Sequence, residues 1–73
     1  MMQQGDLVHI PQNVMLFDRQ NSYLGTTDKP VVAVLIEEIS DRASFQAGSY
    51  IVFAQGREVS VEKRYIYLME RAC

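Results

Sequence analysis

The chain has 73 residues, of which 48% are hydrophobic, and its formal net charge is −2. This length allows one domain, and the apolar content is high enough for a packed core. The negative charge gives no general attraction to phosphate backbones, and the longest apolar run, residues 30–36, is far too short to span a membrane. Residues 1–4 carry neither a basic nor an apolar segment, so we expect no secretory signal and a cytoplasmic protein without membrane contact.

A core this small needs additional stabilisation, since a domain of this length buries only about 60% of the surface of its unfolded chain. Small folds gain it from disulfides, a metal or oligomerisation. Cys73 is the only cysteine, so no internal disulfide is possible, and one cysteine with one histidine is too little for a structural zinc site. We therefore expect no metal and no cofactor, and either an efficient small core or one that is completed by self-association.

Short apolar runs separated by turn residues predict an all-β domain. The first run covers residues 5–11. Val8 and Ile10 share one face of this strand, whereas His9 lies on the other. The run ends at a proline, which cannot donate a hydrogen bond to the ladder.

A second short run, residues 14–17, is followed by the longest polar stretch of the chain. This stretch, residues 18–29, is rich in turn-forming residues and predicts a long loop. Tyr23 and Leu24 lie in its middle, and we expect these two side chains to pin the loop to the rest of the domain.

The run over residues 30–40 is the longest predicted strand, and it is apolar on both faces. Val32, Val34 and Ile36 share one face, and the alternate positions are also apolar, with Val31, Ala33, Leu35 and Ile39 on the other. An antiparallel strand with one wet face should instead alternate apolar and polar residues. We therefore expect the Val32 face to be covered by the long loop, by the opposite wall of a barrel or by another copy of the chain.

The second half of the chain predicts a hairpin. Residues 41–48 read as a polar connection, and residues 50–55 and 57–61 read as two strands. A tight turn at Gln55-Gly56 joins them, because glycine can adopt the positive φ that such turns require.

The segment over residues 62–71 is ambiguous. It matches either a short helix or a single turn followed by a short strand. The aromatic and β-branched residues at 65–67 favour the second interpretation, with the strand over residues 65–68.

The order of these segments resembles that of SH3-like barrels. The first strand opens with Gly5-Asp6-Leu7-Val8, and the hairpin at Gly56 precedes Val59-Ser60-Val61-Glu62-Lys63-Arg64-Tyr65-Ile66-Tyr67. The resemblance covers the whole chain and implies an all-β, small five-stranded SH3-like barrel, with residues 1–73 as a single domain. The chain is also similar to short SH3-like proteins of tailed phages and marine metagenomic collections, which implies an accessory or regulatory protein of unknown activity.

Two departures from better-known small barrels restrict the expected function. Signalling SH3 domains bind Pro-rich peptides in a groove built with a tryptophan pair, and this chain has no tryptophan, so we do not expect that activity. The Sm-like barrel is the near neighbour in fold, and its rings of subunits paired through edge strands would explain the doubly apolar strand. The usual N-terminal helix of that family has no room before Gly5.

No catalytic or phosphate-binding constellation is evident, so we expect no enzyme activity. His9 has no nucleophile or carboxylate partner near it in the sequence. Glu37 and Glu38 point to opposite faces of a strand, and the glycines do not form a phosphate-binding loop. The expected function is therefore a non-enzymatic interaction module that binds itself, a protein partner or both.

Apolar strand faces and tyrosines suit protein interfaces. On this basis the candidate interaction surface consists of Val32, Val34, Ile36, Tyr50, Tyr65 and Tyr67. The alternative is an Sm-like oligomeric RNA-binding protein, with RNA contacts at Arg57, Lys63 and Arg64. Glutamates interleaved with these three cations dilute the basic patch, which favours the interaction module.

Overall fold

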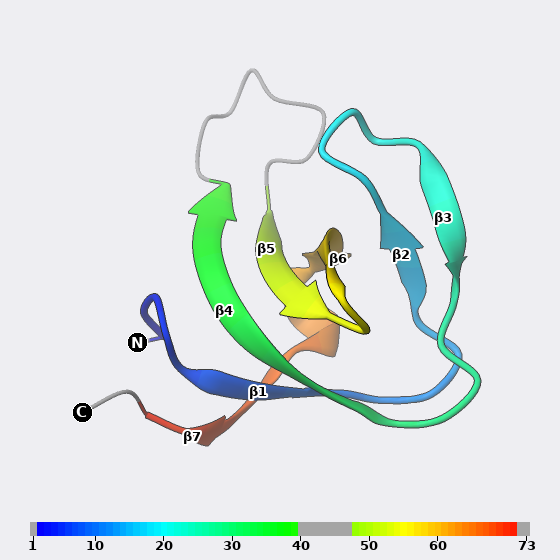
Figure 1. The fold of residues 1–73 in the computed structure, drawn as a ribbon. Coiled ribbons are helices and arrows are strands. Elements are labelled where there is room, and N and C mark those ends of the chain that lie inside the picture. The colour runs from blue at the N-terminus through cyan, green and yellow to red at the C-terminus, as the bar shows by residue number, and fades with distance from the viewer. Residues whose placement is uncertain (1, 40–47, 72–73) are drawn as a thin grey trace.

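The computed structural model describes residues 2–39 and 48–71, which form one antiparallel sheet of seven strands (Figure 1). The strands are β1 (Leu7–Ile10), β2 (Met15–Phe17), β3 (Tyr23–Thr26), β4 (Val31–Ile39), β5 (Ser49–Ala54), β6 (Arg57–Glu62) and β7 (Tyr67–Glu70), with a 3₁₀ helix, η1 (Lys63–Tyr65), before the last. Their order in the sheet is β3-β2-β6-β5-β4-β1-β7. The prediction of an all-β chain is confirmed, and the described residues contain no α-helix.

The sheet is open rather than closed into a barrel, and it has seven strands instead of the predicted five. The hairpin of β2 and β3 lies in the segment that the sequence divides into a short run and a long loop. This hairpin joins the other strands through a single pair, Phe17 of β2 with Ser60 of β6. The edges of the sheet are β3 and β7, and no pairing between described residues joins them, so the curved sheet does not close.

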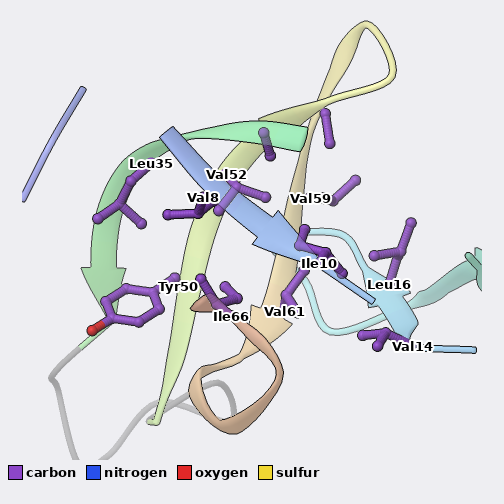
Figure 2. Close-up of a cluster of buried hydrophobic side chains, with 12 residues drawn as sticks. Val8, Ile10, Val14, Leu16, Leu35, Tyr50, Val52, Val59, Val61 and Ile66 are labelled. Atoms are coloured by element: carbon purple, nitrogen blue, oxygen red, sulfur yellow. The ribbon is translucent and has the colours of Figure 1, made fainter. Parts of the chain in front are cut away.

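The core lies on the inner face of the curved sheet (Figure 2). Val8 and Ile10 of β1 are fully buried, which confirms the predicted inward face of the first strand. The core cluster contains Val8, Ile10, Val14, Leu16, Ala33, Leu35, Tyr50, Val52, Ala54, Val59, Val61 and Ile66. Leu24 packs against this cluster, as expected for a residue that pins the long loop, whereas Tyr23 is exposed.

A β-bulge interrupts β4, the longest strand. Val34 pairs with Phe53 and Glu37 pairs with Ile51, so Ile36 is the extra residue between them. A bulge shifts the alternation of side chains by one position. Glu37 and Ile39 therefore continue the outer face of β4, so the predicted grouping of Ile39 with Leu35 is wrong, and Ile36 is the unpaired residue of the bulge.

The hairpin of β5 and β6 closes through two residues with positive φ. Ala54 pairs with Arg57, and the residues between them, Gln55 and Gly56, have φ of 54° and 84°. Left-handed conformations at both positions match the right-handed twist of the flanking strands. The predicted turn is confirmed; the predicted connection over residues 41–48 lies outside the described residues except for Gly48.

The ambiguous segment after β6 is one turn of 3₁₀ helix followed by β7, so the turn-and-strand interpretation is confirmed, although the strand covers residues 67–70 rather than the predicted 65–68. Ile66 lies between the two and is buried in the core, which anchors the turn. β7 then pairs with the free side of β1, with Tyr67 opposite His9 and Leu68 opposite Val8.

A buried threonine fastens the connection after β1 to the connection before β4. The Thr27 side chain accepts a hydrogen bond from the Val14 amide at 3.0 Å and donates one to the Pro11 carbonyl at 2.7 Å. Its backbone carbonyl accepts from the Asn13 amide at 2.7 Å, and its amide donates to the Val14 carbonyl at 3.0 Å. Thr27 is only 3% exposed, so these bonds have little competition from water.

Candidate interaction surface

Exposed apolar side chains cross the outer face of the sheet, on the side opposite the core. Directly paired residues of an antiparallel sheet point to the same face. Phe53, Val34 and Leu7 pair in one row across β5, β4 and β1, and Val32, His9 and Tyr67 pair in a second row across β4, β1 and β7. We call these six residues the outer band.

The large apolar residues of the outer band are strongly exposed. The exposed fraction is 54% for Val32, 39% for Val34, 47% for Phe53 and 55% for Tyr67. Neither the long loop nor an opposite wall covers them, as far as the structure describes the chain. Of the three covers that the doubly apolar strand suggested, the described residues provide neither the loop nor the opposite wall, and another copy of the chain stays a prediction.

His9 is the one titratable imidazole of the chain, and it lies within the outer band. Its ring is half-buried, with its centroid 6.5 Å from that of Tyr67 at an interplanar angle of 48°. Val32 is its other neighbour in the row. Its directly paired neighbours are therefore apolar and aromatic, and the carboxylate of Glu70 belongs to the neighbouring pair on β7.

The structure divides the surface that the sequence predicted. Val32, Val34 and Tyr67 lie in the outer band, whereas Ile36 is half-buried at the bulge. Tyr50 is only 8% exposed and belongs to the core, because its position pairs with Val61 on the inner face. Tyr65 is half-buried and packs against the core, so neither of these two tyrosines belongs to the exposed surface.

Sequence reasoning missed Phe53, Leu7 and His9 as members of the surface. The signal for Phe53 was present, because residues 50–53 form a second run that is apolar on both faces. The completely buried Ile51 shows why this signal is insufficient: it shares the outer face with Phe53 but is covered.

Arg19 forms two ion pairs on the outer face, next to the outer band. Its guanidinium bonds Glu37 Oε1 of β4 at 2.7 Å and Glu58 Oε1 of β6 at 2.9 Å. Glu37 pairs with Ile51 and Glu58 pairs with Phe53, so the two bonds hold the loop of the β2–β3 hairpin against the outer face. The pKa of Arg19 is raised, mainly by its hydrogen bond to Glu37 and next by its hydrogen bond to Glu58.

Replacing Arg19 with methionine tests how much this bridge contributes. All three side chains are about half exposed, so we expect a loss of no more than about 1 kcal/mol in unfolding free energy. The difference from the wild type should shrink as salt is added, because exposed ion pairs are screened. Urea unfolding at low and high salt measures it, and a large loss that does not change with salt would contradict the small contribution expected of these exposed ion pairs.

The cations proposed as RNA contacts do not form one patch. Arg57 begins β6, and Lys63 follows its end, so about 20 Å of strand separates the two. Lys63 bonds Glu38 and lies over the Tyr50 ring at 5.4 Å. Arg64 bonds Glu62 at 2.8 Å and lies over the Tyr65 ring at 4.9 Å.

Comparisons of the chain with protein-family models, with curated proteins and with solved structures found no match. Within residues 2–39 and 48–71, no group of three or more His, Cys, Asp or Glu side chains is placed to hold a metal ion. The same part of the chain contains no helix with the length and hydropathy needed to cross a membrane.

Proposed function

We propose that this protein is a non-enzymatic interaction module that works by burying the outer band of its sheet against another protein surface. The observation that carries the proposal is the exposure of Val32, Val34, Phe53 and Tyr67 on one face. The largest contiguous apolar patch of a typical monomeric protein covers about 300–600 Å² and is often a functional site. Glu58 and Glu70 lie at the two ends of the row that contains Phe53, and the band between them is apolar or aromatic apart from His9.

The strand order supports the interpretation that the fold is an open relative of the SH3-like barrel. β1 lies between β4 and β7, a long hairpin follows β1, and a 3₁₀ turn precedes the last strand. These features match the order that the sequence suggested, with the β2–β3 hairpin in the position of the long loop. Function does not follow from such a fold, so the proposal is based on the outer band alone.

The ion pairs disfavour the RNA-binding alternative. Nucleic-acid affinity depends on several Lys or Arg side chains that reach phosphates. Lys63 and Arg64 each bond a glutamate of this chain, and Arg19 bonds two. A phosphate would have to compete with these carboxylates on a chain of net charge −2.

Affinity capture with a matched control tests the proposed function. The wild type, Val32→Asp and Met15→Asp are immobilised, and bound proteins from the native host are compared by quantitative mass spectrometry. Met15 is 49% exposed on β2, outside the outer band, so it controls for the loss of an exposed apolar residue. We expect at least one protein, untagged copies of this chain included, to be retained by the wild type and Met15→Asp and lost by Val32→Asp.

Circular dichroism and thermal melting establish that each immobilised variant is folded. Identical sets of bound proteins for all three would contradict the proposed function. Band-dependent capture that disappears on nuclease treatment would favour the RNA-binding alternative.

A further inference from the structure

The exposed area of the outer band is close to what one side of a dimer interface requires. A large apolar side chain has about 150–250 Å² of surface, so the exposed fractions of Val32, Val34, Phe53 and Tyr67 correspond to roughly 400 Å². Leu68 of β7 is 37% exposed, but it pairs with Val8 and therefore points to the inner face, so it does not add to this area. A stable interface buries about 600–1,000 Å² on each partner, and about 65% of a homodimer interface is apolar. The outer band thus supplies about the apolar area that the smallest such interface needs.

The outer band is also suited to meet an identical surface. A two-fold axis brings the same patch of both subunits together, so a charged patch would face its own charge. The described side chains in both rows are apolar or aromatic apart from the imidazole of His9. Glu58 lies beside Phe53, but Arg19 already bonds its carboxylate. Glu70 lies opposite Leu7 at the far end, on the sheet edge.

We propose that the outer band is the contact between two copies of this chain, stacked sheet on sheet about a two-fold axis. This inference depends on the proposed function, because it names the protein that the interaction module binds. Two packed sheets lie about 10 Å apart and bury the side chains between them. A second copy would thus supply the cover that no described part of the chain provides for Val32 and Val34. It would also enlarge the small core of the domain.

Mass measurement in solution tests the dimer directly. Light scattering after size exclusion, from micromolar to millimolar concentration, should give twice the chain mass of 8.4 kDa for the wild type. Val34→Asp places a carboxylate in the contact and should raise the dissociation constant at least about a hundredfold, because burying an unpaired charge costs several kcal/mol. Met15→Asp, outside the outer band, should remain dimeric.

His9 provides an independent measurement of the same contact. Apart from Leu7 on its own strand, its neighbours are Val32 and Val34 of β4 and, on β7, Tyr67 and Glu70. Glu70 is the only charged group among them. Covering His9 with a second copy penalises its charged form. The dissociation constant should therefore rise by about tenfold between about pH 7.5 and about pH 5.5, and His9→Leu should remove this dependence.

The sign of the pH effect is informative. Protonating His9 changes the net charge of each copy from −2 toward −1, which by itself would reduce repulsion and strengthen association. Weakening at low pH thus requires that His9 is covered in the contact. Strengthening at low pH would overturn the assignment of this face.

Two further results would overturn the proposal. One is a wild type that stays monomeric up to millimolar concentration, and the other is a Val34→Asp variant that remains fully dimeric. Should Val34→Asp fail to fold, Phe53→Ser serves as the second variant. If the wild type is monomeric but captures a different protein through the outer band, the dimer is excluded and the proposed function stands. If it is monomeric and captures no protein through the outer band, both the dimer and the proposed function are excluded.

Discussion

Val61→Asp is expected to abolish folding at room temperature. Val61 is fully buried in the core, where β6 pairs with Tyr50 of β5. An unpaired carboxylate at such a position costs several kcal/mol, and the loss of packing adds to it. Domains of this size have a total stability of only about 5 kcal/mol or a little more, so the unfolded state becomes the more populated one. Far-UV circular dichroism and urea unfolding measure the result.

The same substitution at Val34 is the matched control for Val61→Asp. Val34 is 39% exposed on the outer face, and a carboxylate there keeps access to water. Its monomer should melt within a few degrees of the wild-type monomer, although its association is lost. Similar melting temperatures for the Val61 and Val34 variants would contradict the assignment of inner and outer faces.

Thr27→Val is expected to lower the unfolding free energy by about 2–5 kcal/mol. Valine has nearly the shape of threonine but lacks the hydroxyl, so the Val14 amide and the Pro11 carbonyl lose their partner. An unsatisfied buried backbone group costs about 1–3 kcal/mol. A loss of this size lowers the melting temperature by about 10 °C or more in a domain of this length.

Thr27→Ser separates the hydroxyl from the methyl group. Serine keeps both hydrogen bonds and removes only the methyl, so we expect a loss of no more than about 1.5 kcal/mol. Calorimetry of the three proteins gives the comparison. If valine were tolerated as well as serine, the hydrogen bonds of Thr27 would not fasten the two connections.

The sequence predicted the strands whose formation depends on local signals. β1 is defined by its alternation and a terminal proline, and the turn between β5 and β6 by Gly56. The turn and the strand after β6 were predicted from the aromatic and β-branched residues at 65–67, although this signal places the strand two residues too early. In each case the residues in a window of a few positions determine the backbone.

The β2–β3 hairpin could not be predicted in the same way. β3 is only four residues long, contains Gly25 at φ 153° and has no buried residue. It is a strand because β2 pairs with it, and that pairing includes a register shift between Leu16 and Phe17. A polar, glycine-containing segment carries no local sign of such a partner, so its sequence is typical of a loop.

The candidate interaction surface could be predicted only in part, because it also depends on contacts between residues that are distant in the sequence. Alternation identified Val32 and Val34 as a shared face, but the bulge at Ile36 shifts the faces of the rest of β4. Which of the apolar residues 50–53 are exposed depends on the segment that reaches the outer face at β6, where Phe17 pairs with Ser60 and Arg19 bonds Glu58, and this segment is more than thirty positions away in the sequence. Coverage by a distant segment leaves no mark on local periodicity.

The place of β1 between β4 and β7 has a consequence for synthesis of the protein. As the chain leaves the ribosome, β1 can pair with β4 once residue 34 has emerged, but its other side waits for residues 67–70. Throughout that interval β1 is an edge strand with unpaired backbone groups, and such an edge can pair with a neighbouring chain. Polysomes hold many copies of the same nascent chain close together, and β7, which is made more than thirty residues after residue 34, is the strand that ends this exposure.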